Sequence, residues 1–265
     1  NSDYEGQMPA RYLRHGSQPE GVPVITDMPQ LEPFWAAGFS FSRGHFKLRV
    51  PYDAYQPMVF QGEEIAVGIR GFTHGYDFYA PRDSVVFHEY AEMSKRRKKV
   101  HMFWENTGHA GMGQNSLKRG TAVIGMAPDL DESSWDHSEL KRYGLGTARP
   151  VELFYKLFLI DTKARKATQL CPFVSSGIMH RDFQPYVRAD GLGIDYSFLE
   201  NYDTQETLQI RPRKDQPYWA RQIEKALQGG NPRTLGAAVG AAKRIGLYET
   251  KPELMHRADK RLKSN

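Results

Sequence analysis

The sequence predicts a globular fold in which helices and strands are mixed. A helical period follows Gly62, where Ile65, Ile69 and Phe72 recur at i, i+4 and i+7. Short strand-like runs flank this helix, and the clearest is the alternating run at 84–88. Composition agrees, because 40% of the 265 residues are hydrophobic and 12% are aromatic, which is typical of globular chains.

The segment before this helix is expected to be irregular or extended. Residues 1–30 contain four prolines and predict an irregular lead-in, with at most a short strand at 22–26. Residues 31–46 predict a strand-like segment broken by Gly38 and Gly44, two positions where backbone can approach a ligand closely.

The helix after Gly62 carries two carboxylates in its first turn, Glu63 and Glu64. The helix dipole favours negative charge there, so we expect both to be ionised and Glu63 to point outward. By spacing, Glu63 and Arg70 share a face that differs from the apolar one. Gly75 is placed to end the helix.

The remaining elements follow in chain order. In the strand at 84–88, Val86 and His88 share one face, and a five-residue basic run follows at 95–99. Further expectations are a strand at 100–105, a helix or strand at 117–126, a short helix at 134–143 ended by Gly144, a buried apolar segment at 151–160, short strands at 171–180 and 191–199, and helices at 218–227 and 235–245.

Composition excludes several classes of protein. Cys171 is the one cysteine, so no internal disulfide forms. No apolar run reaches the roughly 18 residues of a transmembrane helix, and no signal peptide is visible, although a chain that opens at Asn1 leaves a removed leader open. The spacing of His74, His101, His109, His137 and His180 lacks the HExxH pattern, which argues against a zinc hydrolase.

Positive charge is concentrated at the end of the sequence. Residues 211–265 hold thirteen Lys/Arg against five Asp/Glu, a net +8, whereas the preceding residues sum to −3. Such a tail is typical of segments that contact nucleic acid, acidic lipid or an acidic protein. The alternative is a solvated, partly disordered extension. Aromatics are not interleaved with the basic clusters as single-stranded nucleic acid requires, so no DNA partner is expected.

Five short pieces carry a specific resemblance, through their order and spacing: Ala36-Ala37-Gly38-Phe39, Phe60-Gln61-Gly62-Glu63-Glu64, Arg70, Thr73-His74-Gly75-Tyr76-Asp77 and Val86-Phe87-His88. The run resembles the C-terminal half of the catalytic domain of the cytoplasmic polypeptide hydroxyproline N-acetylglucosaminyltransferases, which modify an SCF ubiquitin-ligase adaptor. It is similar, more distantly, to the mucin-type polypeptide GalNAc-transferases. The similarity covers about residues 30–105, with a weaker continuation through 143–149.

This resemblance implies an α/β fold, specifically a partial GT-A-type domain with a C-terminal extension. It also implies UDP-GlcNAc as the donor, Mn2+ or another divalent cation as the cofactor, and His88 as a metal ligand. The alternative for His88 is a core histidine bonded to a backbone carbonyl. Carboxylate oxygen and imidazole nitrogen suit Mn2+, which would neutralise the leaving diphosphate.

The resemblance also assigns roles to the two carboxylates. Glu63 would bind hydroxyls of the donor sugar, since the resembled hydroxyproline enzymes retain stereochemistry; in an inverting enzyme it would be the general base. Glu64 would either contact the acceptor substrate or cap the helix. The other candidate substrate-binding residues are Gly38, Phe60, Gly62, Arg70, Asp77, Lys95 and Arg96. Arg70 either braces the site or pairs with Glu63 or Asp77, and the basic run is either a solvated loop or a lid over a diphosphate.

One expected motif does not occur where the resemblance requires it. An Asp-x-Asp motif should precede Gly62. The one such triplet in the sequence, Asp129-Leu130-Asp131, instead follows His88, in a polar stretch that predicts a loop. We therefore expect the acceptor-side half of an enzyme, with little turnover of UDP-GlcNAc by itself.

The expected function is metal-dependent transfer of GlcNAc from UDP-GlcNAc to a protein hydroxyl, hydroxyproline, with retention, in the cytoplasm. The alternative is a non-catalytic remnant that acts as a protein-interaction module. The expected organisation is an acceptor-side half at 1–165, a small extension packed on it at 166–210, and a basic, partly helical or disordered tail at 211–265.

Overall fold

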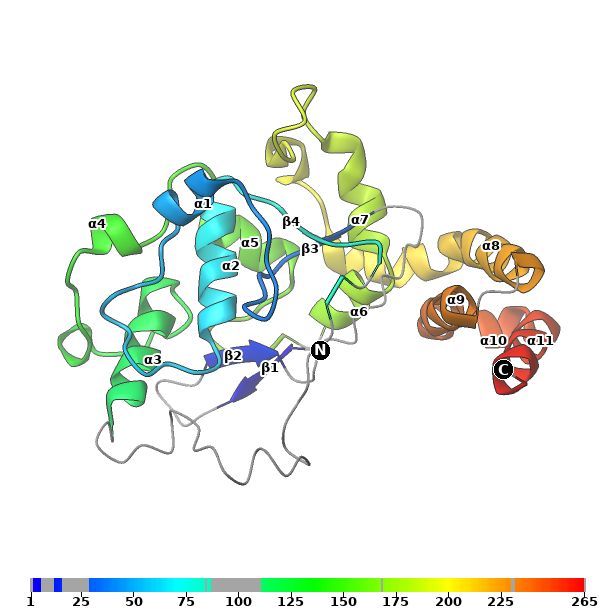
Figure 1. Cartoon of the computed structure of the whole chain (residues 1–265), viewed down its shortest axis with the longest axis horizontal. Helices are drawn as coiled ribbons and strands as arrows, with labels where there is room; N and C mark the ends of the chain where they lie inside the picture. The colour runs from blue at the N-terminus through cyan, green and yellow to red at the C-terminus, as the bar shows by residue number, and fades with distance from the viewer. Residues whose placement is uncertain are drawn as a thin grey trace.

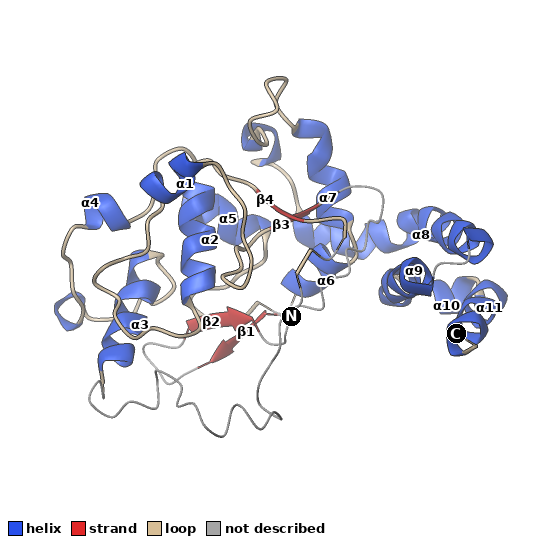
Figure 2. Cartoon of the chain, viewed as in Figure 1, coloured by secondary structure: helices blue, strands red, loops and turns tan. Residues whose placement is uncertain are grey.

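The computed structural model describes residues 2–5, 12–15, 29–83, 85–86, 111–167, 169–229 and 232–264. Helices dominate these residues, and the strands form two small antiparallel sheets (Figure 2). Strand β1 (Ser2–Glu5) pairs with β2 (Tyr12–His15), and β3 (Gln30–Glu32) pairs with β4 (Phe78–Ala80). This mixture is compatible with the expected α/β class.

The helices are α1 (Gly44–Arg49), α2 (Glu63–Thr73), α3 (Met112–Val123), α4 (Leu140–Tyr143), α5 (Val151–Leu157), α6 (Leu170–Ser175), α7 (Ile178–Phe183), α8 (Thr204–Gly229), α9 (Pro232–Arg244), α10 (Leu247–Thr250) and α11 (Pro252–Lys263), with 3-10 turns η5 (Glu132–Ser134), η6 (Gln184–Tyr186) and η7 (Tyr196–Leu199).

Helix α2 lies at the centre of the main body, with α3 and α5 beside it (Figure 1). The predicted apolar face is confirmed, because Ile65, Ile69 and Phe72 are each at most 3% exposed. Phe72 packs edge-on against Phe154 of α5 and Tyr196 of η7. Every residue from Ile65 to Thr73 is buried, so α2 is enclosed on all sides rather than on one face.

The run at 143–149 folds over the C-terminal end of α2. The Ala148 N–H donates to the Thr73 carbonyl at 2.9 Å, and the Gly146 N–H donates to Thr73 Oγ1 at 2.9 Å. A Cβ at Gly146 would lie 2.5 Å from the Thr73 carbonyl oxygen, so only glycine fits this approach. Gly75, with φ of +90°, follows the last helical turn as predicted.

Several predicted strands are not strands in the structure. Of the segment at 31–46, only its first residues belong to β3, and α1 begins at Gly44. The segment at 171–180 forms α6 and the start of α7, and 191–199 forms a turn and η7. Val85 and Val86 lie in irregular backbone, 56% and 48% exposed, so the described part of 84–88 is not a strand. The segments at 22–26 and 100–105 lie outside the described residues.

More of the predicted helices than of the predicted strands are found in the described residues. Residues 117–123 of the ambiguous segment at 117–126 are the end of α3. The helix predicted at 134–143 is confirmed only for its last four residues, which form α4, and the buried segment at 151–160 contains α5. The helices at 218–227 and 235–245 lie in α8 and α9.

The described C-terminal residues form a helical unit. Helices α8–α11 enclose a second apolar core built around Trp219, Ile223, Val239 and Met255. Helix α8 runs through the boundary expected at residue 210, and its first residue, Thr204, donates to the Leu157 carbonyl of α5 at 2.7 Å. Arg181 of α7 forms a bidentate ion pair of 2.5 Å with Asp215 of α8, which joins the unit to the main body. None of the described helices combines the length and hydrophobicity needed to cross a bilayer.

Candidate functional site

The candidate site begins where the chain enters α2. Gln61 and Gly62 have φ of +65° and +82°, so two successive residues adopt left-handed backbone just before the helix. A Cβ at Gly62 would lie 3.0 Å from the Tyr12 ring, which favours glycine at this position for a second reason. This turn sets Glu63 and Glu64 in the first helical turn, where both were predicted.

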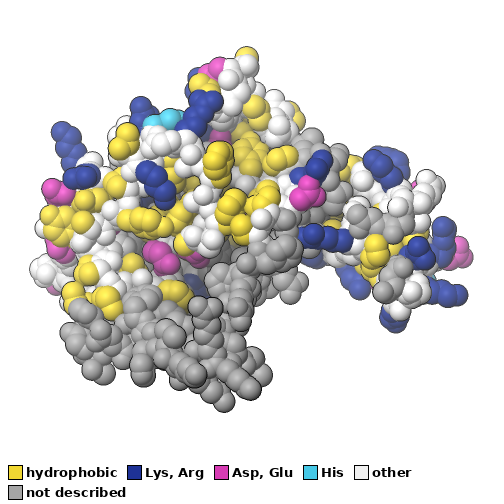
Figure 3. All heavy atoms as spheres, viewed as in Figure 1, with side chains coloured by type: hydrophobic (Ala, Val, Ile, Leu, Met, Phe, Trp, Pro, Cys, Tyr) yellow, Lys and Arg dark blue, Asp and Glu magenta, His cyan; other side chains and the backbone are white. Residues whose placement is uncertain are grey.

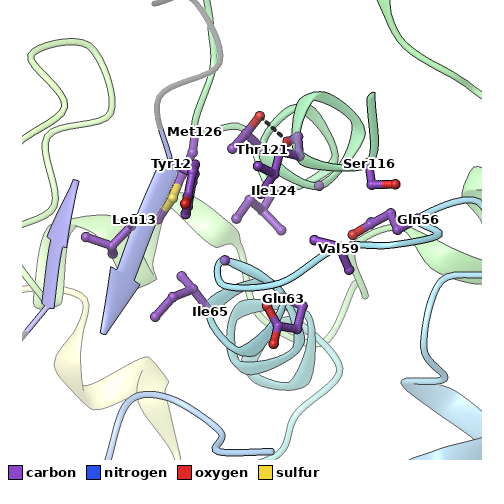
Figure 4. A pocket seen from close by; sticks show the side chains of 13 residues that line it. Tyr12, Leu13, Gln56, Val59, Glu63, Ile65, Ser116, Thr121, Ile124 and Met126 are labelled. Atoms are coloured by element: carbon purple, nitrogen blue, oxygen red, sulfur yellow. Dashed lines mark hydrogen bonds between the residues drawn. The ribbon is translucent and has the colours of Figure 1, made fainter. Parts of the chain in front are cut away.

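Glu63 lines a pocket between α2, β2 and α3 (Figure 4). Its walls are mainly apolar, with Gln56, Ser116 and Thr121 as polar members, and the complete lining is Tyr12, Leu13, Gln56, Val59, Gly62, Glu63, Ile65, Ser116, Leu117, Gly120, Thr121, Ile124 and Met126. The space measures about 270 Å3 with its mouth included. The enclosed part measures only about 10 Å3, roughly the room that one water molecule needs, so this hollow is too small for a whole nucleotide sugar.

The Glu63 carboxylate is not held as the sequence predicted. Its Oε2 atom is buried and has no hydrogen-bond partner among the described residues. Burial raises the pKa of Glu63 to about 7; the hydrogen bond from its own backbone N–H acts in the opposite direction, and the charge of Glu64 adds to the rise. The expectation of a fully ionised carboxylate is therefore wrong, because desolvation outweighs the hydrogen bond from its own backbone N–H.

Glu64 points to a different neighbour. Its Oε1 atom accepts a 2.6 Å hydrogen bond from the backbone N–H of Ala37. Ala37 opens the exposed run that includes Gly38 and Phe39, and a Cβ at Gly38 would meet nothing within 4 Å. Phe60, which precedes the turn at Gln61 and Gly62, is 47% exposed. Through Glu64, the first turn of α2 is thus joined to the predicted backbone segment around Gly38, whereas Glu63 lines a pocket that this segment does not reach.

Two tyrosines near these carboxylates were missed by sequence reasoning. Burial and then the charge of Glu63 raise the pKa of Tyr12, and burial followed by the charges of Glu63 and Glu64 raises that of Tyr52. The Tyr52 ring lies edge-on to Trp35, and Lys47 Nζ is 4.8 Å from both ring centres. Neither tyrosine occurs in a patterned segment, so the sequence holds no signal that could have found them.

Arg70 lies in the protein interior, 2% exposed, and not at the mouth of the pocket. Its guanidinium donates to the carbonyls of Pro51 (2.8 Å) and Gly144 (3.3 Å). Burial lowers the pKa of Arg70 to about 10, an effect that Asp53 partly offsets. The expected pairing with Glu63 or Asp77 is wrong, and these contacts brace the loops around α2.

Asp77 is also committed to internal contacts. It forms an ion pair with Arg149, Oδ1 to NH1 at 2.7 Å, and accepts from the Ile194 N–H at 2.6 Å. Its side chain is 3% exposed. The Arg149 guanidinium lies over the Tyr196 ring at 4.3 Å, which completes a buried cluster. Asp77 in this arrangement secures the 143–149 segment and has no open side toward a substrate.

The proposed metal ligand and phosphate-binding residues, His88, Lys95 and Arg96, lie outside the described residues. Among the residues the structure does describe, no group of three or more His, Cys, Asp or Glu side chains could hold a metal ion, so these residues do not by themselves form the implied site. Asp129 pairs with Arg165 at 3.1 Å and Asp131 caps η5, which agrees with their interpretation as loop residues. His180 is a core histidine, and its Nδ1 accepts from the Leu31 N–H at 2.8 Å.

The geometry defines a helix start with two carboxylates: Glu63 is partly desolvated at a small pocket, and Glu64 binds exposed glycine-containing backbone. Residues 12–164, which contain this whole arrangement, match one family model, described as glycosyltransferase (GlcNAc). The class is therefore that of the glycosyltransferases. The chain belongs to the glycosyltransferase (GlcNAc) family. No curated protein and no solved structure matches the chain.

Proposed function

We propose that this protein transfers GlcNAc from UDP-GlcNAc to a protein hydroxyl, that of hydroxyproline, with retention of configuration. The observation that carries the proposal is the family match across Glu63, combined with the unpartnered Oε2 atom of that residue at a pocket. A buried carboxylate oxygen with no partner loses hydrogen-bond energy, which a sugar hydroxyl would restore. In this proposal Glu63 binds the donor sugar at the pocket mouth.

The remaining residues have supporting roles. Glu64 fixes Ala37 through the 2.6 Å hydrogen bond, so that the backbone at Gly38 stands beside the sugar. Phe60 and Gly62 shape the approach to Glu63. With retention, the acceptor oxygen attacks the face from which the diphosphate leaves, and the leaving diphosphate accepts the acceptor proton. Arg70 and Asp77 act only by holding α2 and the 143–149 segment in place.

A divalent cation, Mn2+, is part of the proposal through His88, with Lys95 and Arg96 near the diphosphate. When bound, the cation would neutralise charge on the leaving group. This assignment is supported by the sequence resemblance, and it is tested by comparing transfer in Mn2+ with transfer in EDTA.

The deciding experiment supplies labelled UDP-GlcNAc and Mn2+ to the protein in its full natural length, with matched peptides that carry either 4-hydroxyproline or proline. We expect label in the hydroxyproline peptide alone, in an α linkage by NMR. Label in neither peptide would support the interaction-module alternative. Label in both peptides would show that the acceptor is another hydroxyl.

A further inference from the structure

The unit formed by α8–α11 has a surface charge that differs from that of the preceding body. Over the described residues from 214 to 264, eleven Lys and Arg side chains are exposed, against three exposed carboxylates, Glu224, Glu249 and Glu253. In Figure 3 dark blue side chains gather over this unit. We define the basic surface by the eleven cations: Lys214, Arg221, Lys225, Arg233, Lys243, Arg244, Lys251, Arg257, Lys260, Arg261 and Lys263.

The fold of the unit turns these cations outward. On α11, Leu254, Met255 and Ala258 are buried in the second core, whereas Arg257, Lys260 and Arg261 are exposed. At about 100° per residue, the three cations are neighbours on the helix surface: Lys260 lies opposite the buried face, and Arg257 and Arg261 lie along its edge. They also stand near the C-terminal end of α11, where cations are favoured by the helix dipole, but that effect does not account for Arg221 and Lys225 on α8.

The composition of the surface distinguishes between polyanionic partners. The apolar side chains of α11 are used in the core, so this helix has no apolar face left to insert into a membrane. Trp219 is 1% exposed, and Lys243 Nζ lies over the Tyr248 ring, 5.4 Å from its centre, so neither offers an open ring for base stacking. Glu253 lies on the same face as Arg257 and Lys260, and its carboxylate would repel a continuous run of phosphates. A protein segment can place its own acidic residues to avoid that repulsion.

We propose that the basic surface of α8–α11 docks an acidic segment of a partner protein. Helix α8 is continuous with the main body, and Arg181 and Asp215 lock it there, so a docked protein is held in a defined position relative to the transferase body. That this partner is the acceptor protein itself rests on the proposed function. The docking itself does not, and it is therefore tested by binding rather than by activity.

The experiment measures fluorescence anisotropy of a labelled peptide of about 20 residues rich in Asp and Glu, at about 0.15 M salt. We expect binding that weakens as salt rises. The triple variant Arg257→Gln, Lys260→Gln, Arg261→Gln should weaken it about tenfold, as three exposed ion pairs are lost. The matched control Lys141→Gln, Lys163→Gln, Lys166→Gln removes the same charge from exposed positions of the body and should leave affinity within about twofold.

Two further arms make the result decisive. A second variant, Arg221→Gln with Lys225→Gln on α8, tests the same surface if the α11 variant unfolds, as judged by its thermal transition. Duplex DNA and phosphatidylserine vesicles are titrated under identical conditions. Tighter binding of either one than of the peptide, equal losses in the control variant, or no peptide binding would each overturn the proposal.

Discussion

Glu64 Oε1 accepts a 2.6 Å hydrogen bond from the backbone N–H of Ala37, which ties the first turn of α2 to the exposed run around Gly38. Two segments separated by 27 residues are thereby brought to one place. Both segments belong to the runs on which the family resemblance rests. The contact places the Glu64 carboxylate and the glycine-containing loop side by side.

Replacing Glu64 by alanine should release that loop. A hydrogen bond to a charged group contributes about 1.5–3 kcal/mol, and exposure reduces this, so we expect a stability loss of about 1 kcal/mol. Amide hydrogen exchange at Ala37 should accelerate. Glu64→Gln keeps an acceptor oxygen in place and should largely preserve protection. Unchanged exchange at Ala37 in Glu64→Ala would show that the contact does not hold the loop.

Arg149→Ala should be the most destabilising of these substitutions. The ion pair of Arg149 with Asp77 is buried, with side chains 9% and 3% exposed, and removing one partner of such a pair costs about 3–5 kcal/mol. Urea denaturation measures the loss. The exposed Lys141→Ala serves as control and should change stability by less than about 0.5 kcal/mol. A loss below about 1 kcal/mol for Arg149→Ala would contradict the structural role given to Asp77.

Glu63 should make stability fall as pH rises. Its pKa is raised from 4.5 to about 7 in the folded protein, so between these values the folded state binds more protons than the unfolded state. The penalty is absent below pH 4.5, grows to about pH 7 and is then constant. After allowance for solvent screening, we expect it to be on the order of 1–2 kcal/mol.

The measurement is the urea midpoint from pH 4.5 to 8 in the unchanged protein and in Glu63→Gln. Burial also raises the pKa of Glu32 to about 7 and lowers that of His74, so only the difference between the two proteins isolates Glu63. That difference should widen with pH in favour of the glutamine variant. Parallel pH curves would contradict a raised pKa for Glu63.

Helix α2 could be predicted because its apolar period is long and Gly75 ends it. The elements around Phe173 and Ile178 could not, since a short apolar run in a fully buried place has no period that separates helix from strand. Tertiary contacts decide there: Phe173 packs with Phe158 and Phe183, and the segment becomes α6 and α7.

In the candidate site, too, local sequence patterns predicted some features and tertiary contacts decided the others. Local rules located Glu63, Glu64 and Gly62 at the helix start. They could not reveal that Glu63 is desolvated, because Leu13, Leu117 and Ile124 come from distant segments to wall its pocket. The spacing of Arg70 was read correctly along α2, but that face is covered by the loops that carry Pro51 and Gly144.

Gly38→Ala separates a structural role from a binding role. A Cβ there meets no atom within 4 Å, so stability should be unchanged or slightly higher. If the donor sugar lies against this backbone, the added methyl group should lower kcat/KM for UDP-GlcNAc by about tenfold or more. Gly44→Ala, also at an open position, is the control. Equal kinetics in both variants would remove Gly38 from the site.

The central claim is that the Glu63 carboxylate binds the donor sugar, and Glu63→Gln tests it most directly. The measurement is kcat/KM for UDP-GlcNAc across pH 5–8.5, made on the protein in its full natural length, with the anomeric configuration of the product read by NMR. Glutamine keeps the shape and removes the charge. A hydroxyl bonded to a charged carboxylate is worth about 1.5–3 kcal/mol, so we predict a ten- to hundredfold loss above pH 7 that shrinks at lower pH, where Glu63 is protonated, and an α-linked product. A loss of two to four decades with a β-linked product would instead identify a general base, and a rate within about twofold of the unchanged protein would contradict any role in substrate binding.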